Sequence, residues 1–371
     1  MSRTPEKTIQ YPKTLLIGVQ TPYNQHLDLD AYLAEFENLA KSNGVIAEKT
    51  MVVKLREINS ATFFTTGKLE EIKQLCAELK IAEVIISETL NAQQERNLDR
   101  ALDCKIIDRT RLILEIFNRS ALTAEGQLQV QVAYLQFLKS RLSGKGIHLS
   151  QQLGMIGTRG PGETAKERET QHIEEMILKL KRRINKTHQV RETQRKQRLR
   201  SDEPLICLIG YTNSGKSTIL NSLTNSTVLA EDKLFATLDT TSRELFIDHK
   251  KIGIISDTVG FIQQLPHKLI EAFKATLSEL QHADLLLLVT DIADKNWKQH
   301  IQTVLSILEE LKVQDKKILY VFNKADKLTD EELTGLTTQI GAYSPYVVVS
   351  AKTKVGLEPL SKELATWFKQ K

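Results

Sequence analysis

The sequence predicts an α/β protein in which two regions of alternating strands and helices flank a pair of long amphipathic helices. Strand-like apolar runs alternate with helical apolar spacing over residues 14–122, and the same alternation returns over 203–371. The stretch between them has heptad-like spacing instead. With 371 residues, 41% of them hydrophobic, the chain is long enough for more than one core.

The first region predicts a small N-terminal α/β domain over residues 14–122. Strands are expected at 14–19, 45–55, 84–87 and 105–108, with helices between and after them at 28–42, 68–79, 92–101 and 110–118. Strands that alternate with helices form largely parallel sheets. This region has no phosphate-binding glycine motif.

Residues 123–200 predict an antiparallel helical hairpin. Two apolar stripes support it: Leu128, Val132, Leu135 and Leu142, then Ile173, Ile177, Leu180 and Ile184. Packing of one helix on the other explains both stripes, but packing on the flanking domains explains the outer turns equally well. The connection at 143–162 contains six glycines, which favours a mobile loop over a regular element.

The second hairpin helix has a strongly basic end. Residues 179–200 contain ten lysines and arginines but one acidic residue, Glu192, an excess greater than the +5 of the whole chain. A solvated helix face is the ordinary explanation for a charge run. Because nearly all of these charges are positive, they repel one another, and this repulsion instead favours contact with a nucleic acid. Our candidates for RNA contact here are Lys179, Lys181, Arg182, Arg183 and Lys186.

Composition also bears on the compartment. The first 13 residues lack the apolar core of a signal peptide, and the apolar run at 285–289 is far shorter than the roughly 20 residues that span a bilayer. The three cysteines are far apart, which favours free, buried thiols in a reducing compartment. We therefore expect a cytoplasmic protein without membrane insertion.

A phosphate-binding loop follows the expected strand at 205–209. Residues 210–217 read GYTNSGKS, which fits the GxxxxGK[ST] pattern between a strand and a helix. In such loops backbone N–H groups surround the β-phosphate, Lys216 neutralises phosphate charge and Ser217 offers its hydroxyl to Mg²⁺. We expect nucleotide contacts from Gly210, Tyr211, Thr212, Asn213, Ser214, Gly215, Lys216, Ser217 and Thr218.

Three later strands end in short motifs that complete a nucleotide site. DTVG follows the strand at 252–256; Asp257 can hold Mg²⁺ through water, and the Gly260 N–H can meet the γ-phosphate. NKAD follows the strand at 318–322, and Asp326 presents two acceptors to guanine N1–H and N2, which adenine cannot match. SAK follows the strand at 347–349. The expected contacts are Asp257, Thr258, Val259, Gly260, Asn323, Lys324, Ala325, Asp326, Ser350, Ala351 and Lys352.

These motifs in this order predict a P-loop GTPase domain over residues 203–371 that binds GTP and GDP with Mg²⁺. The first switch is less plain, because FATLDTTSR at 235–243 offers Thr237, Thr240 and Thr241 as alternative sensing hydroxyls. Nucleotide contacts are expected from Phe235, Ala236, Thr237 and Leu238. The candidate metal ligands are Ser217, Thr237 and Asp257.

The sequence identifies no catalytic residue. Many GTPases keep a glutamine after DTVG to orient water, but Phe261 stands there and cannot hydrogen-bond water. Intrinsic hydrolysis should therefore be slow. Gln263 and Gln264 lie nearby, although glutamines in a loop are more often without a catalytic role. Asn213 is a candidate ligand for K⁺ beside the phosphates.

With these residues in hand, the chain resembles the HflX family of translation-associated GTPases, within the Obg–HflX group. The similar stretches are the switch segment FATLDTTSR, DTVGFIQQLPHKLIEAFKATLSEL at 257–280, RGPGET at 159–164 and IIDRTRLILEIFNRSALTAEGQLQV at 106–130. The chain differs where the family usually has Pro at Thr240, Gln-Leu-Glu at 165–167 and Arg-Asp at Gln263 and Gln264.

The resemblance implies a protein that binds the large ribosomal subunit and its RNA and splits or rescues ribosomes under stress, with GTP hydrolysis stimulated by ribosomes. The glycine loop with Arg159, a further RNA-contact candidate, would then approach the peptidyl-transferase region. ATP hydrolysis, linked to some members, is not what the guanine motif predicts. A ribosome-biogenesis GTPase and an RNA-binding switch that hydrolysis resets are the alternatives. We expect a monomer that associates with ribosomes or with a membrane surface.

Overall fold

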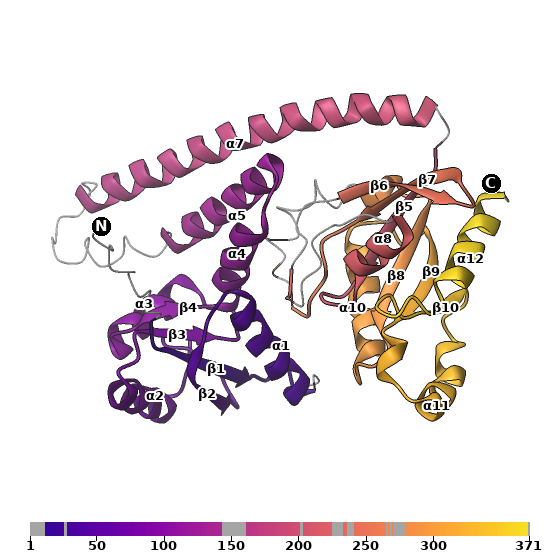
Figure 1. Cartoon of the computed structure of the whole chain (residues 1–371). Coiled ribbons are helices and arrows are strands. Elements are labelled where there is room, and N and C mark those ends of the chain that lie inside the picture. The colour runs from indigo at the N-terminus through magenta and orange to yellow at the C-terminus, as the bar shows by residue number, and fades with distance from the viewer. Residues whose placement is uncertain are drawn as a thin grey trace, which may run out of the picture. The chain divides into compact units, whose positions relative to one another are not determined.

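The computed structural model describes residues 12–25, 28–142, 161–200, 203–224, 233–235, 241–264, 266, 269 and 279–369, with side chains over 167–187 in the stretch 161–200. Contacts divide the chain into two compact units, Met1–Ile116 with Tyr134–Ile177, and Phe117–Ala133 with Leu178–Lys371. Each unit has its own sheet (Figure 1). The α/β class expected from the alternating pattern is confirmed.

The sheet of the first unit has four strands in the order β2-β1-β3-β4, all of them parallel. They are β1 (Thr14–Gln20), β2 (Ala47–Lys54), β3 (Glu83–Ile86) and β4 (Lys105–Ile107). Leu15, Ile17, Val84 and Ile86 are fully buried in a core on this sheet. Their burial explains why these strands read as continuous apolar runs, as parallel strands do.

Four helices connect and follow these strands: α1 (Leu29–Ser42), α2 (Thr66–Leu79), α3 (Ala92–Leu102) and α4 (Arg109–Ser120). Polar side chains fix their starts. Asp28 accepts from the N–H groups of Asp30 and Ala31, and Asn91 forms a capping box with Gln94. Such caps satisfy N–H groups that have no partner inside the helix.

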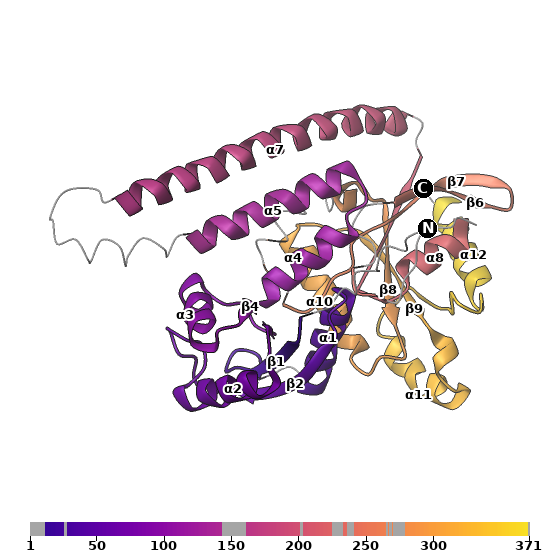
Figure 2. The same ribbon diagram turned by 60° about the vertical axis from the view of Figure 1, so that its left-hand side comes forward.

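Two long helices run antiparallel beside each other, α5 (Ala124–Leu142) and α7 (Pro161–Arg200), as both views show (Figures 1 and 2). Lys139 and Glu174 join them through an ion pair of 2.6 Å. The expected stripes lie inward, since Val132, Leu142, Ile173, Ile177 and Ile184 are buried and Leu128, Leu135 and Leu180 are half-buried.

The start of α7 corrects the loop expected at 143–162. The helix already begins at Pro161, so the loop ends two residues earlier than expected. Proline fits the first helical position because its fixed φ suits the helix and its missing N–H is not needed there. Residues 143–160 lie outside the described residues.

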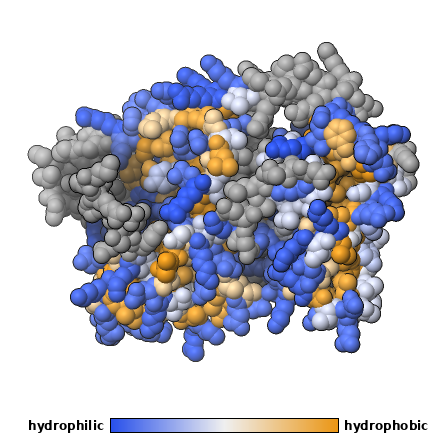
Figure 3. Space-filling model, viewed as in Figure 1, coloured by the Kyte–Doolittle hydropathy of each residue, from blue (hydrophilic) through white to orange (hydrophobic). Residues whose placement is uncertain are grey.

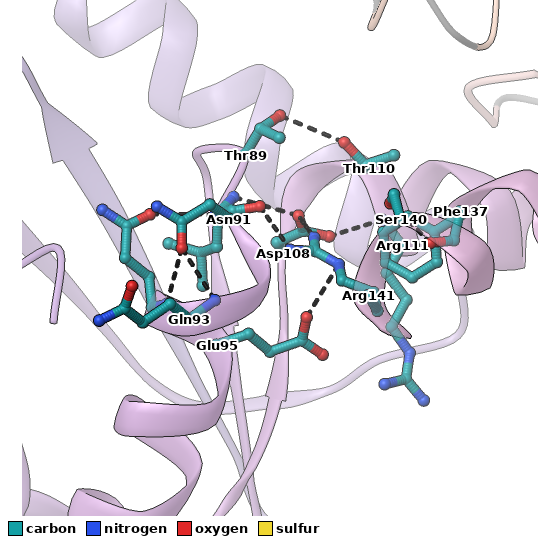
Figure 4. Close-up of polar contacts among 12 residues, drawn as sticks. Thr89, Asn91, Gln93, Glu95, Asp108, Thr110, Arg111, Phe137, Ser140 and Arg141 are labelled. Atoms are coloured by element: carbon teal, nitrogen blue, oxygen red, sulfur yellow. Dashed lines mark hydrogen bonds and ion pairs between the residues drawn. The ribbon is translucent and has the colours of Figure 1, made fainter. Parts of the chain in front are cut away.

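Arg141, next to the last residue of α5, is held at the carboxyl edge of the four-stranded sheet (Figure 4). Its Nη2 lies 2.5 Å from Asp108 Oδ2, its Nη1 donates to the Leu90 carbonyl at 2.6 Å, and its Nε lies 3.0 Å from Glu95 Oε2. Asp108 also accepts from the N–H of Arg111 in the first turn of α4. One buried carboxylate thus joins β4, α4 and α5.

The second unit has a six-stranded sheet in the order β10-β9-β8-β5-β7-β6. Its strands are β5 (Leu205–Gly210), β6 (Thr241–Ile247), β7 (Lys250–Asp257), β8 (Leu285–Asp291), β9 (Lys317–Asn323) and β10 (Tyr346–Val348). All neighbours are parallel except β6, which runs antiparallel to β7 at the edge. The carboxyl ends of β5, β7, β9 and β10 carry the motifs identified above.

The described helices of this unit include α8 (Lys216–Thr224), α10 (Trp297–Glu310), α11 (Asp330–Ile340) and α12 (Leu357–Lys369), with a short 3₁₀ helix at Ala325–Lys327. Cys76, Cys104 and Cys207 are free and buried, as expected. Within the described part of the chain, no helix is long and apolar enough to cross a membrane. Hydrophilic residues cover most of the face in Figure 3, with hydrophobic ones in small groups.

Candidate nucleotide site

The loop between β5 and α8 can form only with glycine at two positions. Gly210 has φ +152°, and a Cβ on it would lie 2.2 Å from the Val289 carbonyl oxygen. Gly215 has φ +93°, and a Cβ there would lie 2.2 Å from Asn323 Nδ2. Asn213 takes a positive φ of 58°, which asparagine tolerates. The glycines of the motif therefore meet both a conformational and a steric requirement.

Lys216 begins α8 with its ammonium folded back over the loop. Nζ donates to the Tyr211 carbonyl at 2.8 Å and lies 3.3 Å from that of Gly210. The side chain is buried, and burial lowers its pKa to about 8, although the nearby Asp257 carboxylate opposes the shift. Because this buried ammonium has lost most of its hydration, a phosphate group beside it would strongly stabilise its charge.

Ser217 and Asp257 come together from different elements. The Ser217 hydroxyl donates to Asp257 Oδ2 at 2.5 Å, and Asp257 is fully buried at the end of β7. The hydroxyl of Thr258 instead donates to the Leu208 carbonyl at 2.7 Å, so it is hydrogen-bonded to β5. The pair of oxygens from Ser217 and Asp257 is the donor chemistry that Mg²⁺ prefers.

The segment after β7 lies directly against the phosphate loop. A Cβ on Gly260 would come within 2.8 Å of Thr212 Cα and 3.0 Å of Lys216 Nζ, so only glycine fits. The N–H of Phe261 donates to the Gly210 carbonyl at 3.1 Å, and the Phe261 carbonyl accepts from the N–H of Thr212 at 2.7 Å. The Phe261 ring is buried, with 1% of its surface exposed.

Asn323, the last residue of β9, joins the phosphate loop to the SAK loop. Its Nδ2 donates to the Ser214 carbonyl at 2.9 Å, and its Oδ1 accepts from the Ala351 N–H at 3.0 Å. Asp326 lies on the exposed side of the same turn, where its Oδ1 accepts from the Ser350 hydroxyl at 2.6 Å. Side chains of NKAD and SAK and backbone atoms of the phosphate loop thus form one connected rim.

Two residues of the site, Asp291 and His300, were missed by the sequence reasoning. Asp291, the last residue of β8, forms an ion pair of 2.8 Å with Lys324, whose Nζ also donates to the Asn213 carbonyl at 2.7 Å. The Tyr211 ring stacks on His300 of α10, with ring centroids 3.9 Å apart. The sequence did indicate Asp291, as an acidic residue at the end of an apolar strand. It contained no comparable signal for His300.

The remaining candidates fall into four groups. Arg159, Ala236, Thr237 and Leu238 lie outside the described residues, and so does Thr240. Phe235 is buried, with φ +57°. The basic candidates on α7 all have exposed side chains: Lys179, Lys181, Arg182, Arg183 and Lys186. Thr218 and Ala325 are half-buried, Val259 is buried and Lys352 is exposed.

Three family descriptions match consecutive parts of the chain. Residues 30–118 match "GTP-binding GTPase N-terminal", and residues 120–198 match "GTP-binding GTPase Middle Region". Residues 205–324, which include the phosphate loop, match "50S ribosome-binding GTPase". A solved GDP complex of a protein named SsGBP superposes with a TM-score of 0.51 at 25% identity, covering 96% of this chain and 99% of that one.

Two curated relatives that cover most of the chain are both named GTPase HflX. GTPase HflX of Magnetococcus marinus is 43% identical over 90% of this chain and 76% of its own length. GTPase HflX of Escherichia coli strain K12 is 41% identical over 84% of this chain and 72% of its own length. Together with the strand-end motifs of the six-stranded sheet, these similarities show that the chain belongs to the HflX family of GTPases.

Proposed function

We propose that this chain binds GTP and Mg²⁺ at the carboxyl edge of the six-stranded sheet, and that the large ribosomal subunit stimulates its hydrolysis of GTP. In the cytoplasm it would split or rescue ribosomes under stress. The observation that carries the nucleotide site is the Asn323 network, because it joins a phosphate loop to the loops that read the base. The family name and the ribosome-binding description of residues 205–324 support the partner.

The proposed roles of the side chains follow from their surroundings. Lys216 would neutralise β- and γ-phosphate charge, and the N–H groups of residues 213–217 would surround the β-phosphate. Ser217 would hold Mg²⁺ with its hydroxyl and Asp257 would do so through water; the ion would neutralise charge on the phosphates. Thr237 is kept as a third candidate ligand.

Guanine selection is assigned to Asp326 and Ala351. The Asp326 carboxylate would accept from N1–H and the N2 amino group, while the Ala351 N–H would donate to O6. The Ser350 hydroxyl bonded to Asp326 Oδ1 fixes the orientation of the carboxylate before a base arrives. A fixed acceptor pair discriminates well, because adenine would leave both oxygens without donors.

Slow intrinsic hydrolysis is proposed because the side chain directly after DTVG, that of Phe261, cannot orient the attacking water. The Phe261 ring is buried, so this position supplies only backbone atoms. Stimulation would then bring the missing group or cation to the γ-phosphate. K⁺ near Asn213 stays a candidate, and omission of K⁺ from the turnover assay tests it.

The exposed basic side chains of α7 support contact with ribosomal RNA. Lys181, Arg182 and Arg183 are adjacent and all exposed, so they can approach phosphates without rearrangement. Replacing all three with glutamine should weaken binding to large subunits and reduce the salt slope, with basal GTP turnover as the control. An unchanged salt slope would return this face to a solvated helix surface.

The central experiment measures GTP turnover with and without purified large ribosomal subunits. Turnover that rises with the subunit supports the proposal, whereas turnover indifferent to it argues against the partner. Asp326→Asn should shift preference from GTP to xanthosine triphosphate, because the amide supplies a donor where guanine also has one. Retained GTP preference in that variant would contradict the base-reading assignment.

Light scattering distinguishes a factor that splits ribosomes from an RNA-binding switch that hydrolysis resets. A splitting factor should lower the scattering of assembled ribosomes when a non-hydrolysable GTP analogue is present. A protein that only binds RNA and resets by hydrolysis should leave the scattering unchanged. Association with precursor particles rather than mature subunits would favour a role in ribosome biogenesis.

A further inference from the structure

The phosphate loop contains a side chain that the loop itself does not require. The GxxxxGK[ST] pattern specifies no residue after its first glycine. Here that residue is Tyr211, and only 6% of its surface is exposed. A large buried side chain within a loop made of small residues needs a separate explanation.

The hydroxyl of Tyr211 holds the segment that follows DTVG. The backbone N–H of Gln263 donates to Tyr211 Oη at 2.8 Å, across 52 residues of sequence. Phe261 is bonded to Gly210 and Thr212 on either side of Tyr211, and Tyr211 and Phe261 form a parallel bridge. Two backbone hydrogen bonds and one bond to the Tyr211 hydroxyl therefore hold the backbone from 261 to 263 on the phosphate loop.

The ring of Tyr211 rests on α10. It lies nearly parallel to the His300 imidazole, at 11° and with 3.9 Å between ring centroids. Burial lowers the pKa of His300, against the opposing charges of Asp294 and Asp291, which favours a neutral ring for stacking. A tyrosine clamped in this way cannot easily turn its hydroxyl away from Gln263.

We propose that Tyr211 is a positioning residue for GTP hydrolysis, which fixes the Phe261–Gln263 backbone and thereby holds the Gly260 N–H where the γ-phosphate is expected. This inference rests on the proposed nucleotide site. Tyr211 does not touch the attacking water in this role. It orders the backbone beside the γ-phosphate, and the group that orients the water must come from elsewhere.

The proposed role predicts that removal of the Tyr211 hydroxyl lowers GTP turnover but leaves GDP binding unchanged. The Tyr211 carbonyl and N–H belong to the phosphate loop and persist when the hydroxyl is removed. GDP, which has no γ-phosphate, should then bind Tyr211→Phe as it binds the unmodified chain. The rate at saturating GTP should fall, because the loss of one hydrogen bond loosens Gly260 only where the γ-phosphate is involved.

The test compares Tyr211→Phe with Tyr320→Phe, which removes a hydroxyl from β9 in the same sheet and serves as the matched control. For Tyr211→Phe, kcat at saturating GTP should fall about fivefold, as one lost hydrogen bond implies, while the Kd for GDP stays within about twofold. Tyr320→Phe should change neither quantity. Thermal unfolding of both variants shows whether the fold is kept.

Two results would overturn the positioning role. An unchanged kcat in Tyr211→Phe would mean that the hydroxyl is merely structural, even if the melting temperature falls. A parallel loss of kcat and GDP affinity would mean that the substitution disturbs the phosphate cradle itself. Failure of the proposed function would appear in the unmodified chain, which would then bind no guanine nucleotide. Failure of this inference alone would appear only in Tyr211→Phe.

Discussion

Lys216 should take up a proton when nucleotide binds at mildly alkaline pH. Burial lowers the pKa of its ammonium to about 8 in the free protein. Phosphate oxygens favour the charged form, so the pKa in the complex should rise well above that value. The free protein therefore holds fewer protons than the complex at pH values above about 7.5. It follows that nucleotide affinity falls as the pH rises through this range.

The expected size follows from the lowered pKa. At pH 7 binding should take up about 0.1 proton and at pH 8.5 about 0.75, with GDP bound about fourfold more weakly at the higher pH. Calorimetry in two buffers of different ionisation enthalpy measures this uptake directly. Lys251→Met should keep the difference, because Lys251 lies at the start of β7, where it is paired with Glu203 and Glu244. Equal uptake at both pH values would refute the reasoning.

Two further predictions concern close contacts. Gly260→Ala places a Cβ 2.8 Å from Thr212 Cα. The affinity for a GTP analogue should therefore fall by more than about tenfold, while the affinity for GDP falls less. Equal losses of the two affinities would contradict the role assigned to Gly260. Arg141→Met leaves the Asp108 carboxylate, 1% exposed, without its cation and should cost about 3 kcal/mol of unfolding free energy in urea. Arg141→Met with Asp108→Asn should regain part of this loss, and additive losses would argue against the pairing.

Much of the site was predictable because its motifs are local. A strand, a glycine loop and a helix start succeed one another at residues 205–217, so the sequence alone predicts the loop that the structure has between β5 and α8. The parallel strands were recognisable in the same way, as short apolar runs. The antiparallel β6 was not, because Leu245 is its one buried residue and its apolar residues are confined to its last three positions.

Contacts between distant residues were beyond the sequence. Arg141 reaches Asp108 across 33 residues, and Tyr211 reaches Gln263 across 52. Each residue taken alone fits several explanations: Arg141 fits the basic last turn of a helix, and Tyr211 fits a bulky residue in a variable position of the loop. Only the fold of the chain gives these side chains their partners, so pattern and periodicity cannot supply them.

Phe261 illustrates how structure changes the meaning of a sequence feature. As a residue type it indicates the loss of a water-orienting group. In the structure its ring is buried while its N–H and carbonyl both bond to the phosphate loop. The segment is therefore anchored at Phe261 and at Asp257, where β7 ends, with three residues between. Phe261 thus supplies no side chain to orient water, but its bonds to the phosphate loop order the backbone beside Gly260.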